Sequence, residues 1–263
     1  MGVFGDIIYA LPTIAALGSG HMYYYNRPWS APLLPKIHNL LPLLEIQPNI
    51  SGVSQHTGEW ITHDLSTYRA GGLNYGDTII ERQARWLRVD VSSIIKTPWL
   101  TVDRIDSIAP IVISRGPRWQ GFFFPWIELV RDHIDDMVFL GTHEDYGIFV
   151  KQFGHAVPWY PTKDLLEMAR VIAGAELFIG SQSCPLAIAE GLHNRTIVEV
   201  CPWALDCMHI RHGNIHVIGG TLRFMWRGTE YSYPSFHKGA SLEQVTLLDR
   251  ANVRYQQLLH LHN

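Results

Sequence analysis

From about residue 110 onward, short apolar runs alternate with segments of helical spacing, and this alternation constrains the fold more than any other feature of the sequence. Each run has the length of a buried strand. Such alternation indicates βα units on a parallel sheet, which binds ligands at the carboxyl ends of its strands. The runs expected to form strands are 111–113, 137–140, 156–159, 177–179 and 196–200, and the expected helices are 124–133, 143–153, 163–173 and 185–192.

The first hundred residues show the same pattern less clearly. Strands are expected at 21–25, 50–54 and 60–65, and helices at 7–17, 33–44 and 77–87. The segment KTPWLTVDRIDS at 96–107 then breaks the pattern with proline and polar residues, so we expect a domain boundary there. The last residues predict an amphipathic helix, in which Ser241 and Gln244 have capping-box spacing. We therefore expect an N-terminal lobe over 1–105, a second lobe over 106–240 and a C-terminal helix over 241–263.

Composition argues against several classes of protein. The 263 residues suffice for one large domain or two compact ones, and a net charge of −3 gives no general case for a nucleic-acid or anionic-membrane partner. No apolar stretch is long enough to span a membrane, and no signal-peptide pattern is visible. Three cysteines indicate a reducing compartment, and the 14 histidines form no HExxH pattern. We expect a cytoplasmic protein with no membrane span and no metal site.

The stretch LFIGSQSCPLAIAEGL at 177–192 has small polar residues between an expected strand and an expected helix. Ser183 is a good N-cap and Pro185 suits a first helical turn, so a simple helix start explains the stretch. A helix N-terminus beside glycine and serine also suits a phosphate, because its free N–H groups and the helix dipole favour an anion. The stretch alone leaves both interpretations open.

Four segments, in order along the chain, resemble the bacterial heptosyltransferases of glycosyltransferase family nine. They are FGDIIYALPT at 4–13, ISRGPRWQGFFFPW at 113–126, FLGTHEDYGIFVK at 139–151 and DLLEMARVIAGAELFIGSQSCPLAIAEGL at 164–192. The resemblance implies an α/β fold of two Rossmann-like lobes that face a cleft, the GT-B architecture, with the C-terminal helix near the lobe junction. It also implies inverting transfer of a sugar from a nucleotide diphosphate sugar, which is the co-substrate, with no further cofactor.

The chain departs from the family's pattern in two places. Only residues 1–4 precede Gly5 and Asp6, where the family has a complete strand, so we expect a shortened N-terminal lobe. Gln182 and Leu186 stand near the positions of the family's usual aspartate and histidine, so the resemblance does not specify the sugar.

The resemblance assigns the acceptor side of the reaction to Asp6. A hydroxyl is a poor nucleophile while it is protonated, and a carboxylate within hydrogen-bond reach can take that proton as general base. The competing interpretation is an ordinary N-cap, because Asp6 follows Gly5 at the expected start of a helix.

Arg115 and Arg118 follow an expected strand and are candidates for the donor side. A departing nucleoside diphosphate gathers negative charge, which a guanidinium meets with paired N–H donors, so no metal ion is required. The family has a basic residue in this loop, which Arg118 matches first and Arg115 second. Two solvated loop arginines are the alternative. Ser181, Gln182 and Ser183 are expected to supply hydroxyl, amide and backbone donors to the same diphosphate.

Three further residues lie at or just after the ends of expected strands and are assigned to the nucleotide. Gly141 and Thr142 are expected to line the base or ribose pocket, and Glu199 to accept hydrogen bonds from ribose hydroxyls. Each position also has an ordinary explanation as a turn or a cap.

The region 209–238 combines arginines with aromatic residues. The ordinary interpretation is a β-rich insertion with packed aromatics, and the alternative is an acceptor platform on which sugars or unstacked bases stack. Our leading prediction is a glycosyltransferase with a hydroxyl acceptor, such as a glycan or a lipid-linked sugar. The alternatives are transfer to hydroxymethylated bases of viral DNA and a non-catalytic module that binds nucleotide sugars.

Overall fold

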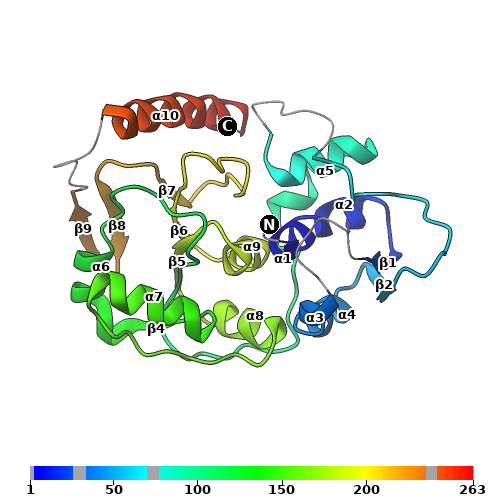
Figure 1. Ribbon diagram of the computed structural model, residues 1–263, viewed down its shortest axis with the longest axis horizontal. Coiled ribbons are helices and arrows are strands. Elements are labelled where there is room, and N and C mark those ends of the chain that lie inside the picture. The colour runs from blue at the N-terminus through cyan, green and yellow to red at the C-terminus, as the bar shows by residue number, and fades with distance from the viewer. Residues whose placement is uncertain (1–2, 26–33, 70–76, 235–241, 263) are drawn as a thin grey trace.

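The larger sheet of the computed structural model, which describes residues 3–25, 34–69, 77–234 and 242–262, is a five-stranded parallel sheet (Figure 1). The strand order is β4-β3-β5-β6-β7, and every neighbouring pair is parallel. The strands are β3 (Ile111–Ser114), β4 (Met137–Phe139), β5 (Leu177–Ser181), β6 (Thr196–Glu199) and β7 (Ile215–Val217). The alternating pattern of the sequence therefore predicted the class of this sheet correctly.

Both faces of the sheet are buried, because successive residues of a strand point to opposite faces. In β3, Val112 packs into one hydrophobic cluster, whereas Ile111 and Ile113 pack into a second. Helices and strands that pack on the two faces contribute to these clusters: α8 (Leu165–Ala173) and α9 (Cys184–Gly191) to the first, and α6 (Trp126–His133), α7 (His143–Phe153), β8 (Leu222–Trp226) and β9 (Thr229–Tyr233) to the second.

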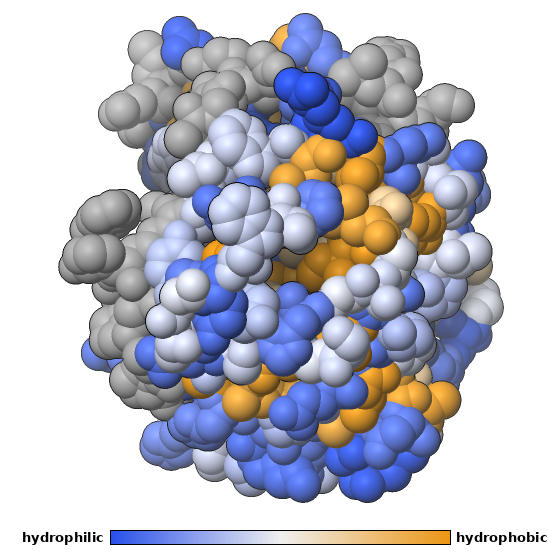
Figure 2. All heavy atoms as spheres, turned by 90° about the vertical axis from the view of Figure 1, so that its right-hand side faces the viewer, coloured by the Kyte–Doolittle hydropathy of each residue, from blue (hydrophilic) through white to orange (hydrophobic). Residues whose placement is uncertain are grey.

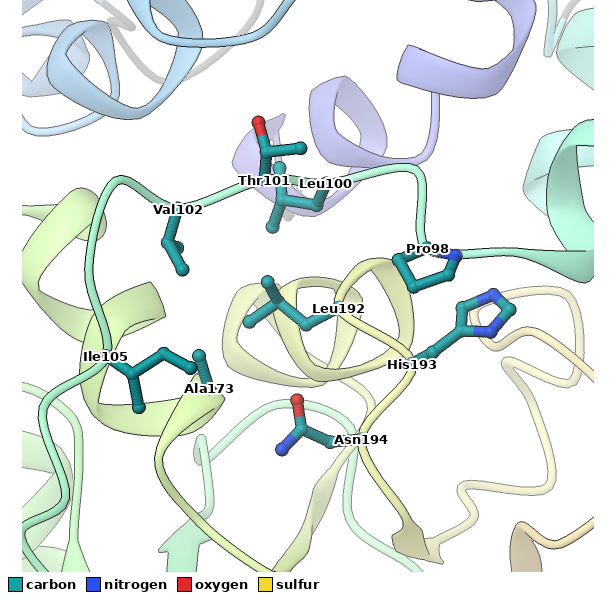
Figure 3. Close-up of a pocket in the computed structure, with 9 residues that line it drawn as sticks. All are labelled: Pro98, Leu100, Thr101, Val102, Ile105, Ala173, Leu192, His193 and Asn194. Carbon is teal, nitrogen blue, oxygen red and sulfur yellow. The ribbon is translucent and has the colours of Figure 1, made fainter.

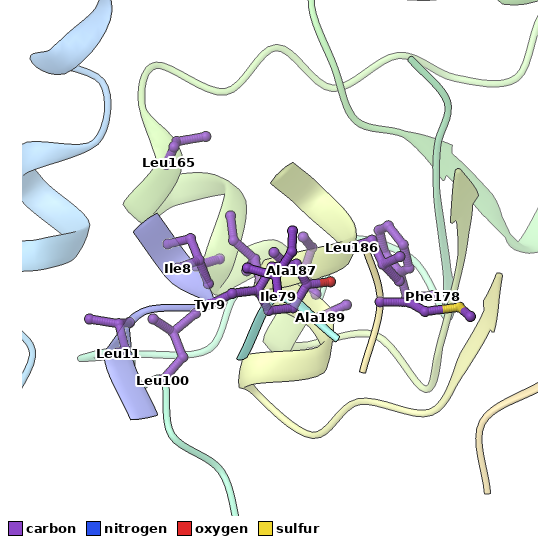
Figure 4. Close-up of a cluster of buried hydrophobic side chains, with 14 of the residues drawn as sticks. Ile8, Tyr9, Leu11, Ile79, Leu100, Leu165, Phe178, Leu186, Ala187 and Ala189 are labelled. Atoms are coloured by element: carbon purple, nitrogen blue, oxygen red, sulfur yellow. The ribbon is translucent and has the colours of Figure 1, made fainter. Parts of the chain in front are cut away.

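A second, separate parallel sheet lies in the N-terminal part, where β1 (Gly20–Tyr24) pairs with β2 (Ile50–Gln55). The helices around it are α1 (Val3–Ile8), α2 (Leu11–Ala16), α3 (Leu34–Ile37), α4 (Leu41–Glu45) and α5 (Ile79–Leu87). Although the sheets are separate, Leu43 and Ile80 belong to the same hydrophobic cluster as Leu186 of α9. Figure 4 shows Ile8 and Tyr9 against α9, so the two halves share one core.

The segment 96–107, predicted as a domain boundary, is packed between the two halves. A short 3-10 turn at Ile94–Lys96 leads into extended chain whose Leu100 is buried. The backbone N–H groups of Trp99 and Leu100 both donate to the carbonyl of Gly191, the last residue of α9. On the other side, the Gln47 amide hydrogen bonds with the backbone of Thr101. The segment therefore joins the halves through backbone contacts.

A pocket of about 350 Å³ lies beside this segment (Figure 3). It is lined by Leu100, Val102 and Ile105 on one side and by residues 192–194, after α9, on the other.

The described part of region 209–238 follows the ordinary interpretation. The β8–β9 hairpin is antiparallel and buries Phe224, Trp226 and Tyr233 in the second hydrophobic cluster. Arg227 forms ion pairs with Asp136 and Glu176. The aromatic side chains are therefore packing residues of a β-rich insertion.

The C-terminal helix α10 (Leu242–His262) lies beside the edge strand β7. The Tyr255 hydroxyl and Nδ1 of His216 are 2.9 Å apart, which ties the helix to that strand. Ser241 lies outside the described residues, and so does the capping box predicted for it. Within the described ranges, no helix has the length and apolar character needed to cross a membrane.

Three local predictions were wrong. Residues 60–65 form no strand, and Trp60 is 89% exposed, so these side chains lie on the surface. Figure 2 faces this side of the molecule and shows an apolar patch among polar residues. The run 156–159 makes a single bridge, between Phe139 and Trp159. The helix expected over 163–173 begins two residues later, at Leu165, because the Asp164 carboxylate caps α8 by accepting the Glu167 N–H.

Candidate active site

The carboxyl ends of the central strands lie at one edge of the main sheet and bring several predicted residues together. The register pairs Ser114 with Gly180, and Ser181 with Glu199. The loops after β3 and β5 also touch, because the Gly116 N–H donates to Oγ of Ser181 at 3.1 Å. The loop after β3 is therefore bonded to the last residue of β5, next to Gln182 and Ser183.

Gln182 and Ser183 shape the start of α9 in different ways. The Gln182 side chain is buried and braces the loop after β6, since Nε2 donates to the Ala204 carbonyl and Oε1 accepts the Cys201 N–H. Ser183 occupies the N-cap position, but its hydroxyl donates to the Ser181 carbonyl and does not cap the helix. The first turn of α9 therefore begins without a side-chain cap.

Arg115 and Glu199 form one buried ion pair, whereas separate contacts with the diphosphate and the ribose were expected for them; those ligand-binding roles stay predictions. Nε and Nη2 of Arg115 donate to the two Glu199 oxygens at 2.8 and 3.0 Å. The third contact of the guanidinium, from Nη1, goes to Gln152 at 2.7 Å, and the Gly121 N–H also donates to Glu199. Burial raises the pKa of Glu199, and Arg115 opposes that rise. The pair therefore holds the loop after β3 against β6.

Arg118 lies in the same loop but is exposed. Its guanidinium is 4.8 Å from the centre of the Trp119 ring, and it forms no ion pair within the described part of the chain. Of the two arginines predicted for the donor side, Arg118 is therefore the one whose charge remains accessible to a ligand.

Gly141 and Thr142 have the turn and cap roles that were the alternative for them. Gly141 has φ +154°, and a Cβ there would come within 2.9 Å of the Phe139 ring. The Thr142 hydroxyl accepts the Asp145 N–H, while the Asp145 carboxylate accepts the Thr142 N–H, which is a capping box. These contacts begin α7 and leave the nucleotide-binding role of both residues untested.

Asp6 lies inside α1, so the N-cap interpretation is wrong. Its side chain is 22% exposed and accepts hydrogen bonds from Tyr68 and Arg69. Helix α1 packs against the start of α9, since a Cβ on Gly5 would lie 3.7 Å from Cα of Cys184. The carboxylate of Asp6 is thus carried by the helix that packs against the uncapped first turn of α9.

Sequence reasoning missed the charged residues around Asp6. Asp206 accepts from Arg69 at 3.4 Å and pairs with the buried Arg82 at 3.2 Å. Tyr68 and Arg69 lie in an irregular segment, and Asp206 in the loop after β6, so no periodic pattern connects them with residue 6. Among the described residues, no cluster of three histidine, cysteine or acidic side chains is arranged to hold a metal ion.

Comparison with known proteins identifies the fold. The sequence matches no family model and no curated protein. The structure is similar to that of the Escherichia coli heptosyltransferase WaaC with ADP, at 11% identity and a TM-score of 0.50, over 81% of this chain and 89% of that one. The chain has a heptosyltransferase-like fold. The mixed α/β class with a parallel sheet, expected from the resemblance, is confirmed.

Two further structures are similar at lower scores. The E. coli ADP-heptose lps heptosyltransferase II is 12% identical over 99% of this chain and 97% of its own, with a TM-score of 0.48. A family 9 glycosyl transferase from Veillonella parvula DSM 2008 is 12% identical over 74% of this chain and 77% of its own, with a TM-score of 0.46.

Proposed function

We propose that this protein is a glycosyltransferase that moves a sugar from a nucleotide diphosphate sugar to a hydroxyl acceptor, with inversion and without a metal ion. The observation that carries the proposal is the packing of α1 on the start of α9. It brings Asp6, a candidate base, to the carboxyl edge of a parallel sheet, where ligands of such sheets bind. The heptosyltransferase-like fold supports the same reaction class.

On the donor side, the proposal uses the first turn of α9 and the exposed Arg118. The bond between the sugar and the diphosphate breaks, and its electron pair leaves with the phosphate oxygen. Backbone N–H groups of an uncapped helix start and a guanidinium both stabilise that charge. Ser181 and Ser183 line the same junction, whereas the Gln182 amide is engaged with residues 201 and 204.

On the acceptor side, Asp6 takes the proton of the attacking hydroxyl. The new bond to the anomeric carbon forms opposite the leaving diphosphate, so a single displacement inverts the configuration there. The products are the glycosylated acceptor and a nucleoside diphosphate, and the carboxyl of Asp6 then returns its proton to solvent. Glycans and lipid-linked sugars are acceptors with suitable hydroxyls.

The test has a binding arm and a turnover arm. Calorimetry with ADP, UDP and GDP identifies the nucleotide, and release of that nucleoside diphosphate from its sugar conjugates, with acceptors present, measures transfer. Asp6→Asn should reduce transfer by roughly 10²–10⁴-fold, because it removes the proton acceptor. Nucleotide affinity should stay unchanged, as it should in the control Asp132→Asn, which alters an exposed ion pair.

One alternative has specific structural support. Arg115, Glu199 and Gln182 make contacts within the protein, which favours a non-catalytic module over a fully equipped donor site. Nucleotide-sugar binding without turnover would establish that alternative and contradict the enzyme. No observation on the described residues specifically favours the DNA-modifying alternative, because the described aromatics of the hairpin are packed and Arg227 is paired.

A further inference from the structure

We propose that Tyr68 and Arg69 are positioning residues that hold the Asp6 carboxylate in one orientation, with Oδ1 turned toward the acceptor hydroxyl. The inference rests on the proposed role of Asp6 as base. The Tyr68 hydroxyl donates to Oδ2 of Asp6 at 2.9 Å. Arg69 donates from Nε to Oδ2 at 3.4 Å and from Nη2 to both oxygens at 3.2 Å.

The two oxygens of Asp6 are therefore unequal. Oδ2 receives three donors, whereas Oδ1 receives one. A carboxylate oxygen has about two lone-pair sites, so Oδ2 is saturated and Oδ1 keeps one for the acceptor proton. The side chain retains 22% exposure, so it is not sealed from solvent. The asymmetry selects Oδ1 as the oxygen that takes the proton.

Arg69 is itself held from its other side. Its Nη1 donates to Asp206 at 3.4 Å, and the same Asp206 oxygen lies 3.2 Å from the buried guanidinium of Arg82. The Arg69 guanidinium also lies over the ring of Tyr68, 5.2 Å from its centre. The backbone of Asp6 is fixed as well, because Gln83 of α5 donates to its carbonyl at 2.9 Å. Donor and acceptor of the Asp6–Arg69 pair are thus both anchored.

The same contacts oppose the effect of burial on Asp6. Burial raises the pKa of the Asp6 carboxyl, while Arg69 and Tyr68 lower it and Asp206 raises it. Tyr9 and Cys207 are the other titratable groups that interact with it. Removal of either donor should therefore raise the pKa of Asp6 further and reduce the fraction of carboxylate that can accept a proton.

Tyr68→Phe is the sharpest test, because it removes one hydroxyl and keeps the ring. In the full chain with labelled aspartate, carbon NMR of the carboxyl should show the pKa of Asp6 raised by roughly one unit. Tyr160→Phe is the matched control, since that hydroxyl also donates to a carboxylate, Glu167 at 3.3 Å, and makes no contact with Asp6. An Asp6 titration unchanged by Tyr68→Phe, or shifted equally by both variants, would overturn the proposal.

The kinetic arm uses the acid limb of kcat/KM against pH. In Tyr68→Phe that limb should move to higher pH by the same roughly one unit, with nucleotide affinity unchanged. Arg69→Gln should shift it in the same direction, and Arg69→Lys should recover part of the shift. A lower rate at every pH with an unmoved limb would contradict positioning. If no sugar is transferred at all, the NMR titration still shows whether Tyr68 lowers the pKa of Asp6, and only the proposed function fails.

Discussion

The guanidinium of Arg115 and the carboxylate of Glu199 are both buried, so each depends on the other to stay charged inside the protein. A buried ion pair is costly to break, because removal of one charge leaves the other without water or partner. We therefore regard this pair as a condition for folding of the loop after β3.

Glu199→Gln tests that role through stability. The amide cannot neutralise Arg115, so the free energy of unfolding in urea should fall by roughly 3–5 kcal/mol. The control Glu176→Gln alters an exposed ion pair with Arg227 and should change stability little. If the Glu199→Gln protein is as stable as the parent but binds the nucleotide more weakly, Glu199 contacts the ligand and the structural role is wrong.

Arg118→Ala tests the donor side of the proposed reaction. Because Arg118 is exposed, its loss should leave the melting temperature almost unchanged. Affinity for the nucleoside diphosphate should fall roughly tenfold to hundredfold in calorimetry, as expected when a charge-assisted contact to phosphate is lost. Arg131→Ala removes another exposed arginine and is the control. Equal affinity of both variants for the nucleoside diphosphate would show that Arg118 does not bind the donor.

The sequence identified candidate residues of the site but not the contacts that they make. The resemblance selected Asp6, but its partners Tyr68, Arg69 and Asp206 come from distant segments that no spacing rule connects. The pairing of Arg115 with Glu199 joins positions at the ends of two strands, and sequence alone could not distinguish this ion pair from two ligand contacts.

Between helices, the contact of α1 with α9 contains an acidic side chain with no exposure. Oε2 of Glu190 accepts the Tyr9 hydroxyl at 2.5 Å and the His209 N–H at 2.9 Å. Burial raises the pKa of Glu190 to about 8, while those donors and Arg211 oppose the rise. Its folded pKa is thus above the unfolded value of 4.5, and the native state binds the proton more tightly.

The pH dependence of stability should follow from Glu190. A group with a raised folded pKa contributes stability that is fully present below the unfolded pKa and is lost as pH rises through the folded pKa. The free energy of unfolding should therefore decline between about pH 4.5 and 8. Glu190→Gln stays neutral and should flatten that decline in urea titrations at pH 5 and 8. Parallel declines in both proteins would show that another group is responsible.

Elements with local signals were predicted best. Thr142 and Gly154 mark the two ends of α7, because capping and a left-handed C-cap are decided by neighbouring residues. Strands were harder to predict, because a strand forms only where a neighbouring strand pairs with it. The apolar run at 60–65 finds none, and β7, which was not predicted, exists only because it pairs with β6.

At the scale of the whole molecule, the shared core should make the two halves unfold together. Leu100 belongs to that core and lies in the segment that joins the halves. Leu100→Ala should lower the free energy of unfolding by roughly 2–5 kcal/mol while circular dichroism and tryptophan fluorescence still report one transition. Ile105→Ala, in the same segment but 63% exposed, is the control. Two separate transitions would show that the halves are independent.

The class of the main sheet could be predicted from the alternation of apolar runs, because both faces of a parallel sheet demand such runs. The close contact between the two halves could not be predicted from the sequence. It depends on Gly5 against Cys184 and on the linker against Gly191, contacts that leave no periodic trace in the sequence.

These two contacts hold α9 at both of its ends. Gly5 lies against the first turn, and the linker backbone is bonded to the last residue. Because α9 is held at both ends, a movement of one half relative to the other would have to break the backbone hydrogen bonds to the Gly191 carbonyl. We therefore expect an acceptor to reach the Asp6 side chain, which keeps 22% exposure, while the two halves stay in place.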